Sequence, residues 1–209
     1  EWLPAIEDES VGLTVFSHPL PTMYSYTNSP RDMGNLADVE EMIEQFGYLV
    51  PELLRVSMPG RSVAIHLAQA MTRKRDGDEV GLRDFRGATI AAMERGGFTY
   101  YGEAVIEKDP QLKAVRTKDR GLLFKTLAAD SAHMRMASAD YLLQFRKPGE
   151  NPRPIRAGVS EKYGNPDGWI TQEEWIEWAN PVWHRATSKY PGGIRETDVL
   201  NVAIARDAE

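Results

Sequence analysis

Short apolar runs alternate along this chain with longer amphipathic stretches, and this alternation restricts the fold more than any other feature. The apolar runs have the length and composition of buried strands and lie at residues 11–16, 62–67, 99–106 and 141–145. Between them, residues 38–56 and 82–95 carry apolar side chains at helical spacing. The order strand, helix, strand, helix, strand predicts a doubly wound α/β sheet with parallel strands.

Polar and turn-forming residues predict where the two helices begin and end. Asp38 followed three residues later by Glu41 resembles a capping box at the start of the first helix. Pro51 should kink or divide this helix, and the Pro59-Gly60 dipeptide should end it before the next strand. The second helix should be closed by Gly96-Gly97.

The loop after the first strand is the expected place for chemistry. The strand ends at Ser17-His18-Pro19-Leu20, and a segment rich in Tyr, Asn and Ser follows. In open α/β sheets, ligands bind at the carboxyl ends of the strands. Proline stiffens such a loop and fixes its backbone oxygens in place.

Charge is distributed unevenly along the 209 residues, whose formal net charge is −6. Residues 1–60 hold 2 basic and 10 acidic side chains, whereas residues 108–156 hold 11 basic and 5 acidic ones. A basic middle between acidic ends is typical of a groove for a polyanion, although a solvated surface without a partner would look the same. The chain has no cysteine and no apolar run of membrane-spanning length, so we expect an intracellular protein without a membrane partner.

A proline-rich stretch at residues 147–154 marks a predicted boundary. It separates an α/β core at residues 1–147, which includes a basic insert at 108–140, from an accessory region at 148–209. This region contains Trp169, Trp175, Trp178 and Trp183, and Thr171, Glu173 and Glu174 should open a helix in it. We expect the tryptophans to form a small core, with base stacking as the alternative.

The chain resembles the phage and bacterial DNA adenine-N6/cytosine-N4 methyltransferases. Residues 17–20 are similar to the family's [Asp/Asn/Ser]-Pro-Pro-[Tyr/Phe/Trp] motif. The resemblance runs nearly end to end, through residues 16–19, 26–35, 81–87, 116–118, 145–152 and 193–201.

The resemblance implies a Rossmann-like methyltransferase sheet that is only partly present, followed at residues 148–209 by a target-recognition-like or accessory region. It also implies S-adenosylmethionine as the methyl donor, double-stranded DNA as the partner and an exocyclic base amine as the acceptor, adenine N6 before cytosine N4. Ser17 and the backbone carbonyl of His18 would accept the two amine hydrogens, while Pro19 would hold the loop. Leu20 would stand where the family places an aromatic residue that stacks on the flipped base.

Two further groups of residues follow from the resemblance. The base pocket would be shaped by Tyr24, Tyr26, Asn28, Arg31 and Asp32. Phosphates would be contacted by Lys108, Lys113, Arg116, Lys118, Arg120 and Lys125. His18 in place of a proline should loosen the loop, and we expect it to be neutral. No metal site is expected, because the other histidines do not have the spacing of metal ligands relative to His18; they are His66, His133 and His184.

The chain also departs from the family in lacking the glycine-rich Phe-x-Gly-x-Gly turn that cradles the cofactor. A truncated chain, a homodimer or a partner chain that completes the site would each account for this. The alternative function is therefore a catalytically silent subunit that binds nucleic acid or an active partner. A third hypothesis, a generic nucleotide-binding α/β domain with no DNA role, is supported only by analogy of fold. The expected setting is the cytoplasm of a bacterial or phage-infected cell with a restriction-modification system.

Overall fold

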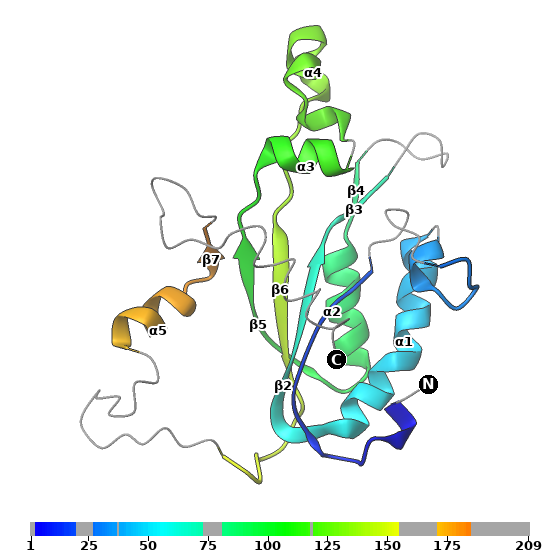
Figure 1. Ribbon diagram of the computed structural model, residues 1–209, viewed down its shortest axis with the longest axis vertical. Helices are drawn as coiled ribbons and strands as arrows, with labels where there is room; N and C mark the ends of the chain where they lie inside the picture. The colour runs from blue at the N-terminus through cyan, green and yellow to red at the C-terminus, as the bar shows by residue number, and fades with distance from the viewer. Residues whose placement is uncertain are drawn as a thin grey trace.

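A five-stranded sheet with two long helices on one face forms the centre of the computed structural model (Figure 1). The structure describes residues 3–19, 27–36, 38–72, 81–117, 119–154 and 171–184. The sheet has the order β1-β2-β6-β5-β7. Its strands are β1 (Val11–Ser17), β2 (Ser57–Ala68), β5 (Thr99–Ile106), β6 (Asp140–Arg146) and β7 (Val182–Trp183).

Helices and short elements connect these strands. The helices are α1 (Val39–Val56), α2 (Phe85–Arg95), α3 (Pro110–Thr117), α4 (Phe124–Ala129) and α5 (Gln172–Trp178). Single 3-10 turns are η1 (Leu3–Ala5), η2 (Met33–Asn35), η4 (Arg120–Leu122) and η5 (Ser131–His133). A separate two-stranded sheet pairs β3 (Ala70–Met71) with β4 (Leu82–Arg83). The described residues contain no helix that is both long and apolar enough to cross a membrane.

The α/β class and the partial Rossmann-like character are confirmed, but the sheet is mixed rather than wholly parallel. β1 pairs with β2 in parallel, whereas β6 is antiparallel to both β2 and β5. The insert that follows β5 carries α3 and α4, and Figure 1 shows both beyond the end of the sheet that β5 reaches. The chain re-enters the sheet at that same end, so β6 must run back along β5.

One face of the sheet carries the hydrophobic core. Side chains alternate along a strand, so Val63, Ile65 and Leu67 of β2 share a face with Leu143 and Phe145 of β6. The helices α1 and α2 pack their apolar sides on this face. In α1 the buried positions recur at helical spacing, at Val39, Met42, Phe46, Val50 and Leu53.

The predictions for the two helices need four corrections. Asp38 caps α1, but its side chain accepts from the Glu40 N–H rather than from that of Glu41. Pro51 lies inside α1 and does not divide the helix. The Pro59-Gly60 dipeptide lies inside β2, because the helix has already ended at Ser57. The second helix begins at Phe85 rather than residue 82, because Asp84 caps it and the two preceding residues form β4.

β1 was expected to be buried and is instead an edge strand of the described sheet. Leu13 is 62% exposed and Val15 is 38% exposed, on the face opposite the helices. Phe16, on the other face, packs against the core. The apolar composition of the run thus predicted the strand correctly, but not its position in the sheet.

The described part of the accessory region contains α5 and β7. The predicted helix start is confirmed, because Thr171 and Glu174 form a capping box. The predicted tryptophan core is wrong for two of its members, since Trp175 is 56% exposed and Trp178 is 60% exposed. Trp169 lies outside the described residues. β7 pairs in parallel with β5, so this region contributes a strand to the main sheet.

Candidate active site

Ser17 and His66 meet at the carboxyl ends of two parallel strands. The register of β1 and β2 places Ser17 beside His66, and the Ser17 hydroxyl lies 3.2 Å from Nδ1 of the imidazole. The His18 backbone N–H donates to the His66 carbonyl at 3.0 Å, which extends the ladder by one bond. Both side chains lie on the face opposite α1 and α2, because they alternate with Phe16 and Ile65 of the core.

Asp140 lies on the other side of His66. The antiparallel pairing of β2 with β6 places the first residue of β6 at the end of β2. One carboxylate oxygen of Asp140, Oδ2, lies 3.2 Å from Nε2 of His66. Ser17, His66 and Asp140 therefore form one hydrogen-bonded chain across three strands.

Two lysines from the insert complete the surroundings of Asp140. Lys108 Nζ lies 3.1 Å from Oδ2, and Lys113 Nζ lies 3.0 Å from Oδ1 while also donating to the Ser138 carbonyl at 2.6 Å. Burial alone would raise the pKa of Asp140, but the His66 hydrogen bond and the charges of Lys113 and Lys108 lower it below its ordinary value. The carboxylate is therefore ionised at neutral pH. We call His66, Asp140, Lys108 and Lys113 the Asp140 cluster.

His18 points the opposite way from Ser17 and is 3% exposed. Its ring lies between Phe46 and Phe85, with centroid distances of 4.5 and 4.9 Å. Burial lowers the pKa of His18 to about 4, against the smaller raising effect of its hydrogen bond to the Pro19 carbonyl. The ring is neutral at pH 7, as expected, and is packed in the core at the start of the loop. The expected loosening of the loop stays a prediction, because residues 20–26 lie outside the described residues.

The two described backbone positions after Ser17 present no free N–H donor. The His18 N–H is used in the ladder with His66, and Pro19 has no N–H. A site that stabilises an oxyanion needs converging N–H groups, and residues 18 and 19 offer none. An amine, in contrast, needs acceptors for its hydrogens, and the Ser17 hydroxyl is one.

The residues predicted for the base pocket are only partly described. Asn28 and Arg31 are exposed, and Asp32 caps η2 by accepting from the Gly34 N–H at 2.9 Å. Asp32 also accepts from the Thr27 N–H at 2.7 Å, so its carboxylate holds the turn together. Leu20, Tyr24 and Tyr26 lie outside the described residues. A base-binding role for all of these residues stays a prediction.

The residues predicted to contact phosphate fall into three groups. Lys108 and Lys113 are only 12% and 13% exposed and are paired with Asp140. Lys125 is exposed on α4. Arg116 and Arg120 lie in α3 and η4, but the structure does not describe their side chains, and Lys118 is not described at all. Their phosphate contacts stay predictions.

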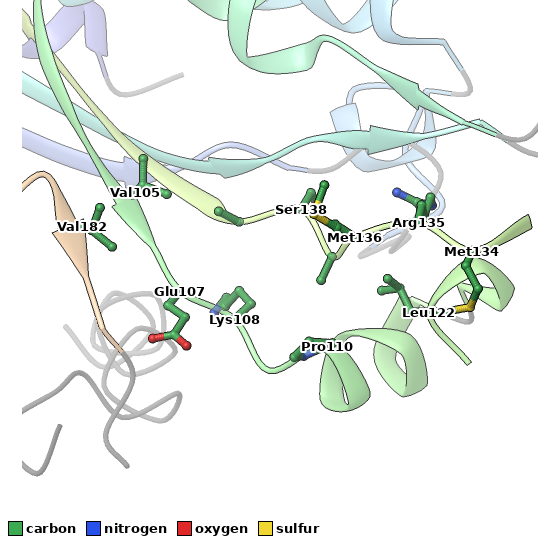
Figure 2. Close-up of a pocket in the computed structure, with 12 residues that line it drawn as sticks. Val105, Glu107, Lys108, Pro110, Leu122, Met134, Arg135, Met136, Ser138 and Val182 are labelled. Carbon is green, nitrogen blue, oxygen red and sulfur yellow. The ribbon is translucent and has the colours of Figure 1, made fainter. Parts of the chain in front are cut away.

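A cavity of about 500 Å³ lies between the ends of the central strands and the insert. Figure 2 shows Val105 and Val182 at one end and Leu122 and Met134 at the other. Lys108 also lines the cavity, so the Asp140 cluster forms part of its wall. The lining is mainly apolar.

Sequence reasoning missed His66 and Asp140, although part of the signal was present. Ser17 follows one apolar run and His66 lies near the end of another, so parallel pairing of the two strands brings them to the same edge of the sheet. Asp140 could not be found in the same way, because it begins its strand. In the expected parallel sheet it would have been at the opposite edge.

Comparison with solved structures shows that this fold is similar to that of a presumed DNA modification methylase. Two crystal structures of a presumed DNA modification methylase from Thermus thermophilus align with 87% of this chain at 16% sequence identity. Their TM-scores are 0.60 and 0.62, and the second is a complex with S-adenosyl-L-methionine. No protein-family model and no curated protein sequence matches the chain. The chain spans 62% and 61% of the length of the two aligned proteins.

Proposed function

We propose that this chain carries the amine-binding half of a DNA methyltransferase, which methylates an exocyclic base amine with S-adenosylmethionine as donor. The observation that carries the proposal is the Ser17 hydroxyl at the carboxyl end of β1, in a loop whose backbone offers no free N–H over residues 18–19. The shared fold with a presumed DNA modification methylase supports it. Adenine N6 is the first product to seek, and cytosine N4 the second.

The chemistry asked of these residues is acceptance of hydrogen bonds. An exocyclic amine is a poor nucleophile because its lone pair is delocalised into the base. Acceptors at the Ser17 hydroxyl and the His18 carbonyl would hold the two amine hydrogens and favour a pyramidal nitrogen. His18 packs under the loop and keeps these acceptors in place, which lowers the cost of organising them during the reaction.

The described residues do not fit the methyl donor. At the Ser17 end of the sheet they form no glycine-lined cradle, and the one carboxylate in the cavity wall, Glu107, is bound to His184 at 3.1 Å. No described residue is therefore assigned to S-adenosylmethionine. The proposal concerns only how the base amine is held.

A methylation assay with nucleoside analysis tests this function. The chain is incubated with S-adenosylmethionine and duplex DNA, and the DNA is digested and analysed for N6-methyladenine and N4-methylcytosine. Ser17→Ala should lower product formation about 10- to 100-fold, because the hydrogen bond from the base amine to the Ser17 hydroxyl is lost while positive charge develops on the amine. Ser10→Ala is the matched control, since Ser10 donates only to the Glu7 carbonyl in an exposed turn.

Calorimetric titration with S-adenosylmethionine separates the ways in which the assay can fail. Cofactor binding without any methylated base would contradict the proposed reaction. Absence of cofactor binding by a folded chain would contradict catalysis by this chain alone and favour the silent-subunit alternative. Equal product from wild type and Ser17→Ala would remove Ser17 from the site.

A further inference from the structure

The order of hydrogen bonds from Asp140 to Ser17 fixes where the Ser17 proton points. An ionised Asp140 can only accept, so the Nε2 atom of His66 carries the hydrogen in the 3.2 Å contact between them. In a neutral imidazole, Nδ1 is then an acceptor. The 3.2 Å contact from Nδ1 to Ser17 is therefore made by the hydroxyl hydrogen of Ser17.

A second, more distant acceptor lies within reach of the Ser17 hydroxyl hydrogen. The His66 backbone carbonyl lies 3.4 Å from the Ser17 hydroxyl, but it already accepts from the His18 N–H at 3.0 Å. The shorter contact with Nδ1 is thus the favoured one. With its hydrogen directed at His66, the Ser17 oxygen keeps its lone pairs for a substrate.

From this geometry we infer that His66 and Asp140 are positioning residues, which turn the Ser17 hydroxyl into a hydrogen-bond acceptor for the base amine. A serine needs such help more than a carboxylate would, because its own hydrogen can occupy the direction from which the amine approaches. Lys113 binds Oδ1 of Asp140, and Lys108 binds Oδ2, the oxygen that also faces His66, so both lysines hold the carboxylate in place. This inference rests on the proposed function for its substrate.

The arrangement resembles a nucleophilic serine with its base, but the backbone of residues 18 and 19 argues against that use. A serine nucleophile needs N–H donors for the oxyanion that it creates, and the two backbone positions after Ser17 provide none. Acceptance of an amine hydrogen needs no such donors. The same three side chains are therefore assigned to orientation rather than covalent catalysis.

Two substitutions of His66 separate its two hydrogen bonds. In His66→Asn, the amide oxygen takes the place of Nδ1 and can still accept from Ser17, while the contact with Asp140 is lost. In His66→Gln, the amide nitrogen takes the place of Nε2 and can still donate to Asp140, while the contact with Ser17 is lost. Melting temperatures of both variants report any structural effect.

If His66 orients Ser17, His66→Gln should lower kcat for DNA methylation about 10-fold with KM little changed, and His66→Asn should retain most of the activity. A purely structural role predicts the reverse order, because Gln keeps the link between β2 and β6. Activity of His66→Gln equal to or above that of His66→Asn would overturn the inference.

Nitrogen-15 NMR of the histidine rings tests the hydrogen-bond order without any methylation. Wild-type His66 should show the Nε2–H tautomer, and Asp140→Asn should shift it toward Nδ1–H. A wild-type Nδ1–H tautomer would overturn the inference even if DNA is methylated. If no base is methylated but the Nε2–H tautomer is found, the proposed function fails while the orientation of Ser17 stands.

Discussion

Ser17 and His18 are neighbours in the sequence, yet they serve opposite faces of the sheet. Strand alternation sends Ser17 to the polar side, where His66 and Asp140 lie, and His18 to the core between Phe46 and Phe85. The buried ring of His18 thus fixes the end of the strand by packing. Two adjacent residues at the end of one strand therefore supply the polar side of the site and its apolar support.

The burial of His18 predicts a loss of stability in mild acid. Its pKa is about 4 in the folded chain and about 6.5 when unfolded, so folding favours the neutral ring. The stabilisation is complete above about pH 6.5 and is lost as the pH falls toward about 4, about 3 kcal/mol in all. Urea denaturation across this range should show the loss.

His18→Phe is the matched variant for this measurement. The phenyl ring can keep the contacts with Phe46 and Phe85 but does not titrate. Carboxylates such as Asp140 respond to acid in both proteins, so the difference between wild type and variant isolates His18. Equal loss of stability in the two proteins would show that His18 does not titrate in this range.

At the scale of elements, α1 tolerates Pro51 because the residue faces solvent. The buried positions of the helix include Phe46, Val50 and Leu53, and Pro51 lies between them on the exposed side. Its missing N–H leaves the carbonyl of Gly47 without its helical partner, on the side where water can replace it. Position in the helix, not the residue type alone, decides whether proline ends it.

Pro51→Ala should therefore stabilise the chain. The substitution restores one helical hydrogen bond and removes a steric conflict without loss of buried surface, because Pro51 is exposed. We expect the free energy of unfolding to rise by about 1–3 kcal/mol, as measured by urea denaturation at neutral pH. Unchanged or reduced stability would mean that the proline fixes a bend that packing of α1 requires.

The strands and helices were predictable from local patterns, but their directions were not. Apolar runs and turn residues located β1, β5, β6 and the C-terminal end of α2, because each depends on neighbouring residues. The antiparallel direction of β6 depends on how the insert folds between Glu107 and Ala139, which no local pattern encodes. The Asp140 half of the site depends on that direction, so it could not be predicted, while Ser17 could.

At the scale of the whole molecule, the described lysines of the basic insert differ in their exposure to solvent. Lys108 and Lys113 neutralise the buried Asp140 and are largely withdrawn from solvent. Lys125, on the projecting α4, is exposed. In Figure 1, α3 and α4 stand beyond the end of the sheet at which β5 ends. A duplex held near Ser17 would approach this end of the sheet, so the exposed charges of the insert are those that can meet phosphates.

Lys125→Glu should weaken binding of duplex DNA and reduce its salt dependence. If Lys125 contacts one phosphate, its loss should change the slope of log K against log salt by about 1. The affinity itself should fall several-fold at low salt. Fluorescence anisotropy of a labelled duplex over a series of salt concentrations measures both quantities.

Arg95→Glu is the control that makes the result specific. Arg95 is exposed at the end of α2, next to the start of β5 and so at the opposite end of the sheet from α4. The Arg95→Glu substitution changes the net charge of the protein by the same amount as Lys125→Glu. If the insert binds DNA, only Lys125→Glu should change the salt slope, because counterion release depends on local contacts. Equal effects of the two variants would mean that DNA responds only to the overall charge, and the polyanion surface would then have to be sought away from α4.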